Sequence, residues 1–376
     1  MRISIALVLL FSVYLLFTSC SNTETNTTLE EELEALFTNE FSTNEPGGSV
    51  LVKKGSEVVF LKSYGVADVN TQEKITENTI FNTGSISKTF VANGILILEE
   101  ENLLSIEDSI SMYFNDFDDV AIANRIKIKH LLSHTSGLPD VRKVSENEAF
   151  YLTAKDLENF EPLKRVTSLN FEPGEKFEYS NPAYNGLALI IEKVTGEKWQ
   201  SFIEERIFQP SGMEDSRITD GPYPENRVAH AYVAVGESYK EDDYGEYPTF
   251  AASGNGGVWS SVLDLAKYED AIREFTFLSK ESVDKSRKVF QYSNWHDTIP
   301  PNIGSSWFIL DKNKQKNDSG VKIIYHTGSQ GGFRAFYVSI PEKDLLYIAL
   351  FNRPVKGLTD FRLKGIELFK KYNWLE

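Results

Sequence analysis

The chain has 376 residues, of which 41% are hydrophobic and 12% aromatic, so it is long enough and apolar enough to bury a large core. Acidic residues outnumber basic residues by 55 to 39, which gives a formal net charge of −16 at pH 7. This excess of negative charge opposes contact with phosphate backbones, so the sequence argues against a nucleic-acid-binding protein.

The first residues have the pattern of an exported protein. Arg2 precedes an apolar run over residues 3–17, which is shorter than the roughly 20 residues that span a bilayer. The run therefore predicts a signal peptide over residues 1–19. Cys20, the only cysteine, follows directly and resembles the lipobox cysteine of bacterial lipoproteins, although Phe17 stands where leucine is usual. The alternative is an incidental cysteine in a peptide that is cleaved elsewhere.

On the lipoprotein interpretation, the mature chain starts at a lipidated Cys20. We then expect an N-terminal lipid anchor in a membrane, on the periplasmic or cell-surface side of a bacterial envelope. Residues 20–44 are predicted to form a polar tether and the start of an N-terminal helix, because apolar residues recur at helical spacing only from Leu29 onward.

The next segments along the chain alternate between strand and helix patterns. Residues 48–65 contain two strand-like runs on either side of Lys54-Gly55, which predicts a hairpin. A lobe over about residues 100–260 is predicted to be rich in helices, and the residues from Asn181 onward carry a clear apolar stripe. Within it, residues 235–250 are acidic and tyrosine-rich and are interpreted as a long loop.

The C-terminal part predicts three strands and a closing amphipathic helix, at residues 321–326, 333–340, 345–352 and 359–372. Strands therefore lie at both ends of the chain, with helices between them. This order predicts an α/β (α+β) fold in which N- and C-terminal strands form one antiparallel sheet flanked by helices, with the helix-rich lobe inserted.

The pattern Ser-x-x-Lys occurs three times, beginning at Ser85, Ser282 and Ser319. Only Ser85 has a strand-like segment before it and an apolar helix after it. That setting places Lys88 one helical turn from the serine, where a neutral lysine can remove its proton. Burial and a helix N-terminus both lower a lysine pKa toward the range useful for a base. The alternative role for Ser85 is an ordinary helix cap.

Two later motifs complete a recognisable series. Tyr179-Ser180-Asn181 stands on a predicted loop before an apolar helix, and His326-Thr327-Gly328 is predicted to end a strand. Ser-x-x-Lys, Tyr-x-Asn and Lys/His-Thr-Gly in this order resemble the serine β-lactamase and penicillin-binding protein superfamily, on the class C side. Further stretches such as "IKIKHLLSHTSGLPD", "SGNGGVWSSVLDLAKY" and "HTGSQGGF" extend the likeness from about residue 45 to the C-terminus.

The resemblance implies a serine hydrolase that forms an acyl-enzyme on Ser85 and needs no cofactor or metal. Lys88 would act as the base, and Tyr179 would share its proton network and protonate the leaving group. Asn181 would hold Lys88 and bind the amide or ester of a small-molecule or peptide substrate. The roles implied for the third motif are substrate binding by His326, Thr327 and Gly328 and, from Ser329, a backbone N–H that completes an oxyanion hole with that of Ser85.

The residue that departs from the β-lactamase pattern is His326, where those enzymes carry lysine. Histidine is mostly neutral at pH 7, so we expect weak recognition of a substrate carboxylate. An esterase or a D-amino-acid peptidase is therefore favoured over a D-Ala-D-Ala carboxypeptidase or a β-lactamase. A non-catalytic binding protein on the same fold is the further alternative, although none of the three motifs is broken. Substrate specificity is expected to lie in loops at about 140–170 and 220–250.

One more pair of residues raises a question of chemistry. His130 and His134 stand four residues apart in "HLLSH", a spacing that can hold a metal. The acidic residue of a His-Glu-x-x-His motif is missing, and no third ligand stands nearby, so the pair is interpreted as packed side chains at the end of a helix.

Overall fold

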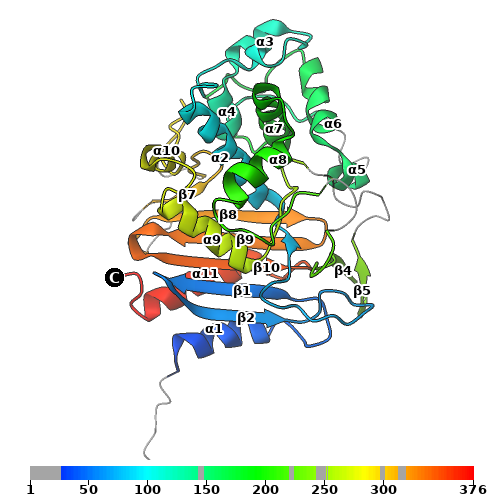
Figure 1. Ribbon diagram of the computed structural model, residues 1–376, viewed down its shortest axis with the longest axis vertical. Helices are drawn as coiled ribbons and strands as arrows, with labels where there is room; N and C mark the ends of the chain where they lie inside the picture. Colours follow the sequence, from blue (N-terminus) through cyan, green and yellow to red (C-terminus); the bar gives the residue numbers. More distant parts are fainter. Residues whose placement is uncertain are drawn as a thin grey trace, which may run out of the picture.

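The computed structural model describes residues 27–142, 148–219, 224–242, 251, 253–296, 301–311 and 319–376. The predicted signal peptide and Cys20 lie outside these residues and stay predictions. Among the helices in the described ranges, none is both long enough and apolar enough to cross a membrane. Figure 1 shows a sheet in the lower half of the molecule and a helical lobe above it.

The α-helices are α1 (Leu29–Thr38), α2 (Ser87–Glu100), α3 (Val120–Arg125), α4 (Ile128–Leu132), α5 (Glu148–Thr153), α6 (Asp156–Phe160), α7 (Asn181–Thr195), α8 (Trp199–Ile203), α9 (Val262–Arg273), α10 (Lys280–Ser286) and α11 (Leu358–Lys371). The strands are β1 (Gly48–Lys54), β2 (Glu57–Tyr64), β3 (Phe81–Asn82), β4 (Tyr232–Val235), β5 (Ser238–Glu241), β6 (Trp259–Ser260), β7 (Phe308–Leu310), β8 (Ile323–Gln330), β9 (Phe333–Ile340) and β10 (Leu345–Phe351). Shorter helical turns are η1 (Gly84–Ile86), η2 (Ile110–Met112), η3 (Glu161–Arg165), the π-helical η4 (Glu204–Phe208) and η5 (Pro341–Lys343).

The main sheet has six strands in the order β2-β1-β10-β9-β8-β7. The N-terminal hairpin joins the C-terminal strands through antiparallel pairing of β1 with β10, in which Gly48 lies opposite Phe351. The predicted α/β sheet built from both ends of the chain is therefore confirmed, and the strand at residues 333–340 has the predicted limits.

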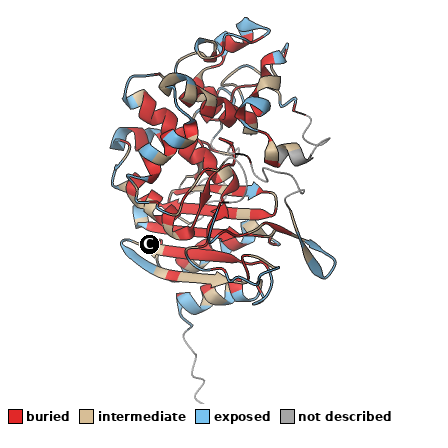
Figure 2. Ribbon diagram, turned by 45° about the vertical axis from the view of Figure 1, so that its right-hand side comes forward, coloured by how far each residue is buried: buried red, intermediate tan, exposed pale blue. Residues whose placement is uncertain are grey.

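Both faces of this sheet are covered, which explains why its central strands are apolar throughout. In β10, Leu346, Ile348 and Leu350 point into the core shared with the helical lobe, whereas Tyr347 and Phe351 point into a second core. Helices α1 and α11 supply the other side of that second core. Figure 2 shows the central strands buried along their length, with exposed residues gathered at the rims.

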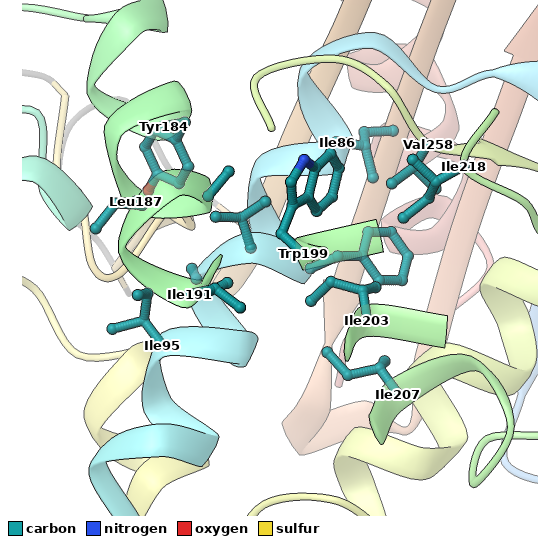
Figure 3. Packing of buried hydrophobic residues seen from close by; sticks show 14 of the residues in the cluster. Ile86, Ile95, Tyr184, Leu187, Ile191, Trp199, Ile203, Ile207, Ile218 and Val258 are labelled. Carbon is teal, nitrogen blue, oxygen red and sulfur yellow. The ribbon is translucent and has the colours of Figure 1, made fainter. Parts of the chain in front are cut away.

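The helical lobe is held on the sheet by α2, whose twelve residues Ser87–Leu98 are buried. Figure 3 shows Ile95 of α2 beside Ile191 of α7, with Ile203 of α8 further along the same cluster. Gly94 allows this close approach, because a methyl group there would lie 2.9 Å from Ile203 and 3.0 Å from Ile191. The tight packing of α2 fixes the position of the segment just before it.

The loops and helices of the lobe differ from the prediction in three places. The helix-rich lobe expected from about residue 100 does not begin with a helix, because α2 ends at Glu100 and Asn102 adopts a positive φ of 58°. Of the expected loop at 235–250, the first residues form the tight hairpin β4–β5, and residues 243–250 lie outside the described ranges. The expected specificity loop at about 140–170 contains α5, α6 and η3.

A buried ion cluster ties α9 to the sheet and to the segment after α10. The side chain of Glu269 is 1% exposed and accepts hydrogen bonds from Arg287 at 2.7 Å and from Arg273 at 2.9 Å. The hydroxyl groups of Tyr337 and Ser339 donate to the same carboxylate. Burial raises the pKa of Glu269, but the two guanidinium groups outweigh it and lower this pKa to about 2.

We predict that Glu269→Gln lowers the free energy of unfolding by about 3 kcal/mol, because it leaves Arg287 buried without its counter-charge. Urea denaturation measures this loss. The folded pKa lies below the unfolded value of about 4.3, so the advantage of the wild type is complete above that pH and shrinks as the pH falls toward 2. Asp284→Asn, which removes an exposed pair with Lys280, is the control and should cost less than about 1 kcal/mol. Equal losses would contradict the prediction.

Candidate active site

Ser85 lies in the turn η1, between β3 and α2. The strand-turn-helix setting predicted for it is present, although a 3₁₀ turn carries the serine and α2 begins two residues later at Ser87. The turn starts at Gly84, whose φ of +53° suits glycine and whose N–H donates to Asn82 Oδ1 at 2.8 Å. Thr83 is tied by its N–H to the carbonyl of Val258 at 2.9 Å. Ser85 therefore lies in a tightly fixed turn just before the start of the buried helix α2.

Lys88 extends from the first turn of α2 to Ser85. Its Nζ lies 3.0 Å from Ser85 Oγ and donates to the carbonyl oxygen of Asn255 at 2.7 Å. The residue is 0% exposed, and its Nζ lies 5.2 Å and 5.8 Å from the ring centres of Tyr179 and Tyr184. Burial, assisted by the positive charge of Arg142, holds the pKa of Lys88 well below its ordinary value of 10.5. A neutral Lys88 has a lone pair available for the Ser85 proton.

Asn181 does not have the contact with Lys88 that the resemblance implied. Among the described residues, no hydrogen bond joins their side chains, and the Asn255 carbonyl binds the lysine instead. Asn181 is the first residue of α7, directly after the capping residue Ser180, whose Oγ accepts from the N–H of Ala183 at 3.3 Å. Sequence reasoning missed Asn255, whose one visible signal was the glycine-rich stretch "SGNGG".

Tyr179 is 37% exposed and rests on His134. The two rings stack with their centres 4.3 Å apart and their planes at 27°. His134 also binds the residues on either side of the tyrosine: its backbone carbonyl accepts from the N–H of Glu178 at 2.9 Å, and its side-chain Nδ1 accepts from the N–H of Ser180 at 3.0 Å. It does so from a positive φ of 55°, a costly conformation for a histidine.

His130 and His134 are both buried, as the packed-pair interpretation expects. His130 accepts from the N–H of Lys127 at 3.1 Å, a contact within its own helix turn. His134 differs because it supports Tyr179, a role that the sequence reasoning missed. Among the described residues, no group of three or more His, Cys, Asp and Glu side chains is arranged to hold a metal ion.

The third motif lies inside β8 and does not end the strand as predicted. The strand continues through Thr327 to Gln330 because these residues pair with β9, with Gly328 opposite Ala335. On the other side β7 pairs only with residues 323–325, so the later part of this edge faces the Ser85 turn. A methyl group on Gly328 would lie 2.0 Å from the carbonyl of Thr83, and one on Gly84 would lie 2.6 Å from the nitrogen of Ser329. The two segments therefore touch through glycine backbone, which brings Ser329 beside the turn of Ser85.

His326 is 1% exposed and lies beneath this edge, 5.3 Å from the ring of Phe308. Its Nδ1 donates to the carbonyl of Thr327 at 2.7 Å, so Nε2 carries the lone pair. Burial, together with the nearby Lys88, lowers the pKa of His326 to about 3. The ring is therefore neutral at pH 7, as the sequence argument expected, and for a stronger reason than the ordinary pKa of histidine.

We predict that His134→Ala slows covalent labelling of Ser85 by an activated phosphonate at least about 10-fold, because Tyr179 loses its stacking partner and the N–H of Ser180 loses its acceptor, Nδ1. Labelling is followed by intact mass. His130→Ala removes a similarly buried ring from α4, the helix that ends just before His134, and should change the rate less than about 3-fold. If both variants slow labelling equally, the loss reflects damaged packing and the role assigned to His134 is wrong.

Comparisons with known proteins agree with this geometry. The family model described as Beta-lactamase matches residues 28–366. Penicillin-binding protein 4* of Bacillus subtilis (strain 168) is 29% identical over 341 residues, which cover 85% of this chain and 71% of that protein. The octameric penicillin-binding protein homologue from Pyrococcus abyssi is 26% identical, with a TM-score of 0.75 over 91% of this chain and 76% of that one.

A further structure is informative about fold alone. The D-amino acid amidase from Ochrobactrum anthropi SV3, solved with L-phenylalanine amide, has a TM-score of 0.72 at 20% identity and covers 92% of this chain and 99% of that one. The family match includes all three motifs and nearly every described element. The chain therefore belongs to the beta-lactamase family and is a serine hydrolase of the β-lactamase and penicillin-binding protein superfamily.

Proposed function

We propose that this enzyme hydrolyses an ester, an amide or a D-amino-acid peptide through an acyl-enzyme on Ser85. The observation that carries the proposal is the fully buried Lys88, with its Nζ 3.0 Å from Ser85 Oγ. A buried lysine without a carboxylate partner is stable only as the neutral amine, which is the form that can activate a serine.

The proposed reaction uses four residues of the site. Ser85 Oγ bonds to the substrate carbonyl carbon while its proton passes to Lys88. The N–H groups of Ser85 and Ser329 stabilise the oxyanion, and Tyr179 donates a proton to the leaving alcohol or amine as the carbon–oxygen or carbon–nitrogen bond breaks. Water then attacks the acyl-enzyme, giving its proton to the network of Tyr179 and Lys88, and Ser85 leaves with a proton restored.

The site offers no unpaired cation among His326 and Arg142 for a substrate carboxylate, which favours substrates that are recognised without one. His326 is neutral where β-lactamases carry a lysine. Arg142, the cation that acts on Lys88, is paired with Asp140 through Nε at 2.8 Å and Nη2 at 2.7 Å. The amidase that shares the fold acts on D-amino acids by its name, which supports this class of substrate. The penicillin-binding relative supports a D-Ala-D-Ala carboxypeptidase as the second candidate.

We expect a fluorophosphonate to add one adduct to the wild-type protein and none to Ser85→Ala, as measured by intact mass. Lys88→Met, which keeps the length of the side chain and removes the base, should slow labelling about 10²-fold or more. Lys285→Met alters the lysine of a second Ser-x-x-Lys in the chain, at an exposed pair with Glu99, and should leave the rate unchanged. An unlabelled wild type would favour the non-catalytic binding protein, and an adduct that persists in Ser85→Ala would show that another residue reacts, which would contradict the proposal.

A substrate comparison tests the argument from charge. Turnover of a short p-nitrophenyl ester and of D-amino-acid anilides should exceed that of a chromogenic cephalosporin, because the neutral His326 provides no cation for the cephalosporin carboxylate. kcat/KM is the quantity to compare. A cephalosporin that is much the best substrate would show that carboxylate recognition comes from elsewhere in the site.

A further inference from the structure

Asp156, the first residue of α6, is a buried carboxylate that the reaction described above does not use. It is 6% exposed, and all three of its side-chain partners are donors. Asn185 Nδ2 and the N–H of Gly254 each donate to Oδ1 at 2.8 Å, and Trp199 Nε1 donates to Oδ2 at 2.7 Å. Figure 3 shows Trp199 within the apolar core of the lobe. Asp156 thus joins α6, α7, α8 and the segment that contains Gly254.

That segment carries the carbonyl group that binds Lys88. Asn185 Nδ2 also donates to Ser253 Oγ, and Ser253 Oγ donates to Asn255 Oδ1, both at 2.6 Å. The N–H groups of Gly256 and Gly257 return to the carbonyl of Ser253 at 3.0 Å and 2.6 Å, which closes a tight turn. We call residues 253–257 the glycine turn. Its middle carbonyl, that of Asn255, is the one that accepts from Lys88 Nζ.

The glycine turn is fixed at both ends. Immediately after it, the N–H of Val258 donates to Ser87 Oγ at 3.0 Å, and the carbonyl of Val258 accepts from the N–H of Thr83 at 2.9 Å. Before its middle residue, Gly254 is pressed onto α7, because a methyl group there would lie 2.7 Å from both Tyr184 O and Ala188 Cβ. Asp156 holds Gly254 in that position. After the glycine turn, the chain is therefore held by residues next to Ser85. Near its start, the glycine turn is held by Asp156.

We propose that Asp156 is a positioning residue for Lys88 and acts by fixing the glycine turn. In that position the Asn255 carbonyl binds one N–H of the neutral Lys88 amine, so the lone pair of the amine faces Ser85. This inference rests on the proposed function, in which Lys88 is the base. Burial raises the pKa of Asp156 to about 7, and the ionised carboxylate offers acceptors to all three donors without bringing a proton of its own. In Asp156→Asn, the side-chain NH₂ must face an N–H donor on one side. At least one of the three hydrogen bonds is therefore lost, although the side chain keeps its size.

The experiment compares three variants with the wild type. Asp156→Asn and Ser253→Ala each interrupt the connection from α7 to the glycine turn. Asp264→Asn is the matched control, because Asp264 is also fully buried and accepts from the N–H groups of Asp215 and Ser216, but it makes no contact with the glycine turn among the hydrogen bonds of the described residues. Unfolding in urea is measured for all three variants, so that rates are compared only between folded proteins.

Two measurements are made on each protein: the rate of fluorophosphonate labelling at Ser85, and the NMR signal of the Lys88 ε-carbon, assigned by its loss in Lys88→Met. We expect Asp156→Asn and Ser253→Ala to slow labelling about 10-fold or more and to move the Lys88 signal. Asp264→Asn should change the labelling rate less than about 3-fold and leave the signal in place.

The outcomes separate this inference from the proposed function. If the wild type is not labelled, the proposed function fails, and the NMR signal alone decides whether Asp156 positions Lys88. If the wild type is labelled but folded Asp156→Asn keeps both its rate and its Lys88 signal, the inference is overturned. If Asp156→Asn does not fold, Ser253→Ala decides by the same two measurements. An equal effect in Asp264→Asn would assign the loss to stability and would also overturn it.

Discussion

The cost of burying a charged amine governs the structure around Lys88. An ammonium group that loses its water and gains no carboxylate is strongly destabilised, so the protein must either pair it or keep it neutral. Among the described residues, the groups that contact the Lys88 amine are a backbone carbonyl, a serine hydroxyl and the rings of Tyr179 and Tyr184. None of these groups is an anion, so the fold selects the neutral amine. Burial thus keeps Lys88 in the neutral form that can accept the proton of Ser85.

The residues around that amine come from the sheet and from the helical lobe, whose backbones must approach each other closely. Gly84 and Gly328 permit the approach of η1 to the edge of β8, and Gly254 permits the approach of the glycine turn to α7. In each case an added methyl group would overlap backbone atoms. The glycines therefore belong to the active site as much as the polar residues do, because each removes a side chain that would hold two elements apart.

Much of the fold could be predicted from the sequence because it rests on local pattern. The apolar run of β9 and the break at Lys54-Gly55 indicate their own strands and hairpin. Ser85 and Lys88 could be found because their spacing follows one helix. His134, Asn255 and Asp156 could not, because their partners lie up to some 170 residues away along the chain. A backbone carbonyl such as that of Asn255 also leaves no signature in residue type, and Asn181 was assigned a contact that this carbonyl makes instead.

The central claim, that Lys88 is a neutral base, is tested most directly by titrating its side chain. The protein can be prepared with ¹³C at the lysine ε-carbons, and the Lys88 signal followed by NMR between acid and alkaline pH. The account predicts a midpoint well below 10.5, separated from the signals of the exposed lysines. A Lys88 signal that titrates with the exposed lysines, near 10.5, would mean that the amine is charged at neutral pH and cannot take the proton of Ser85.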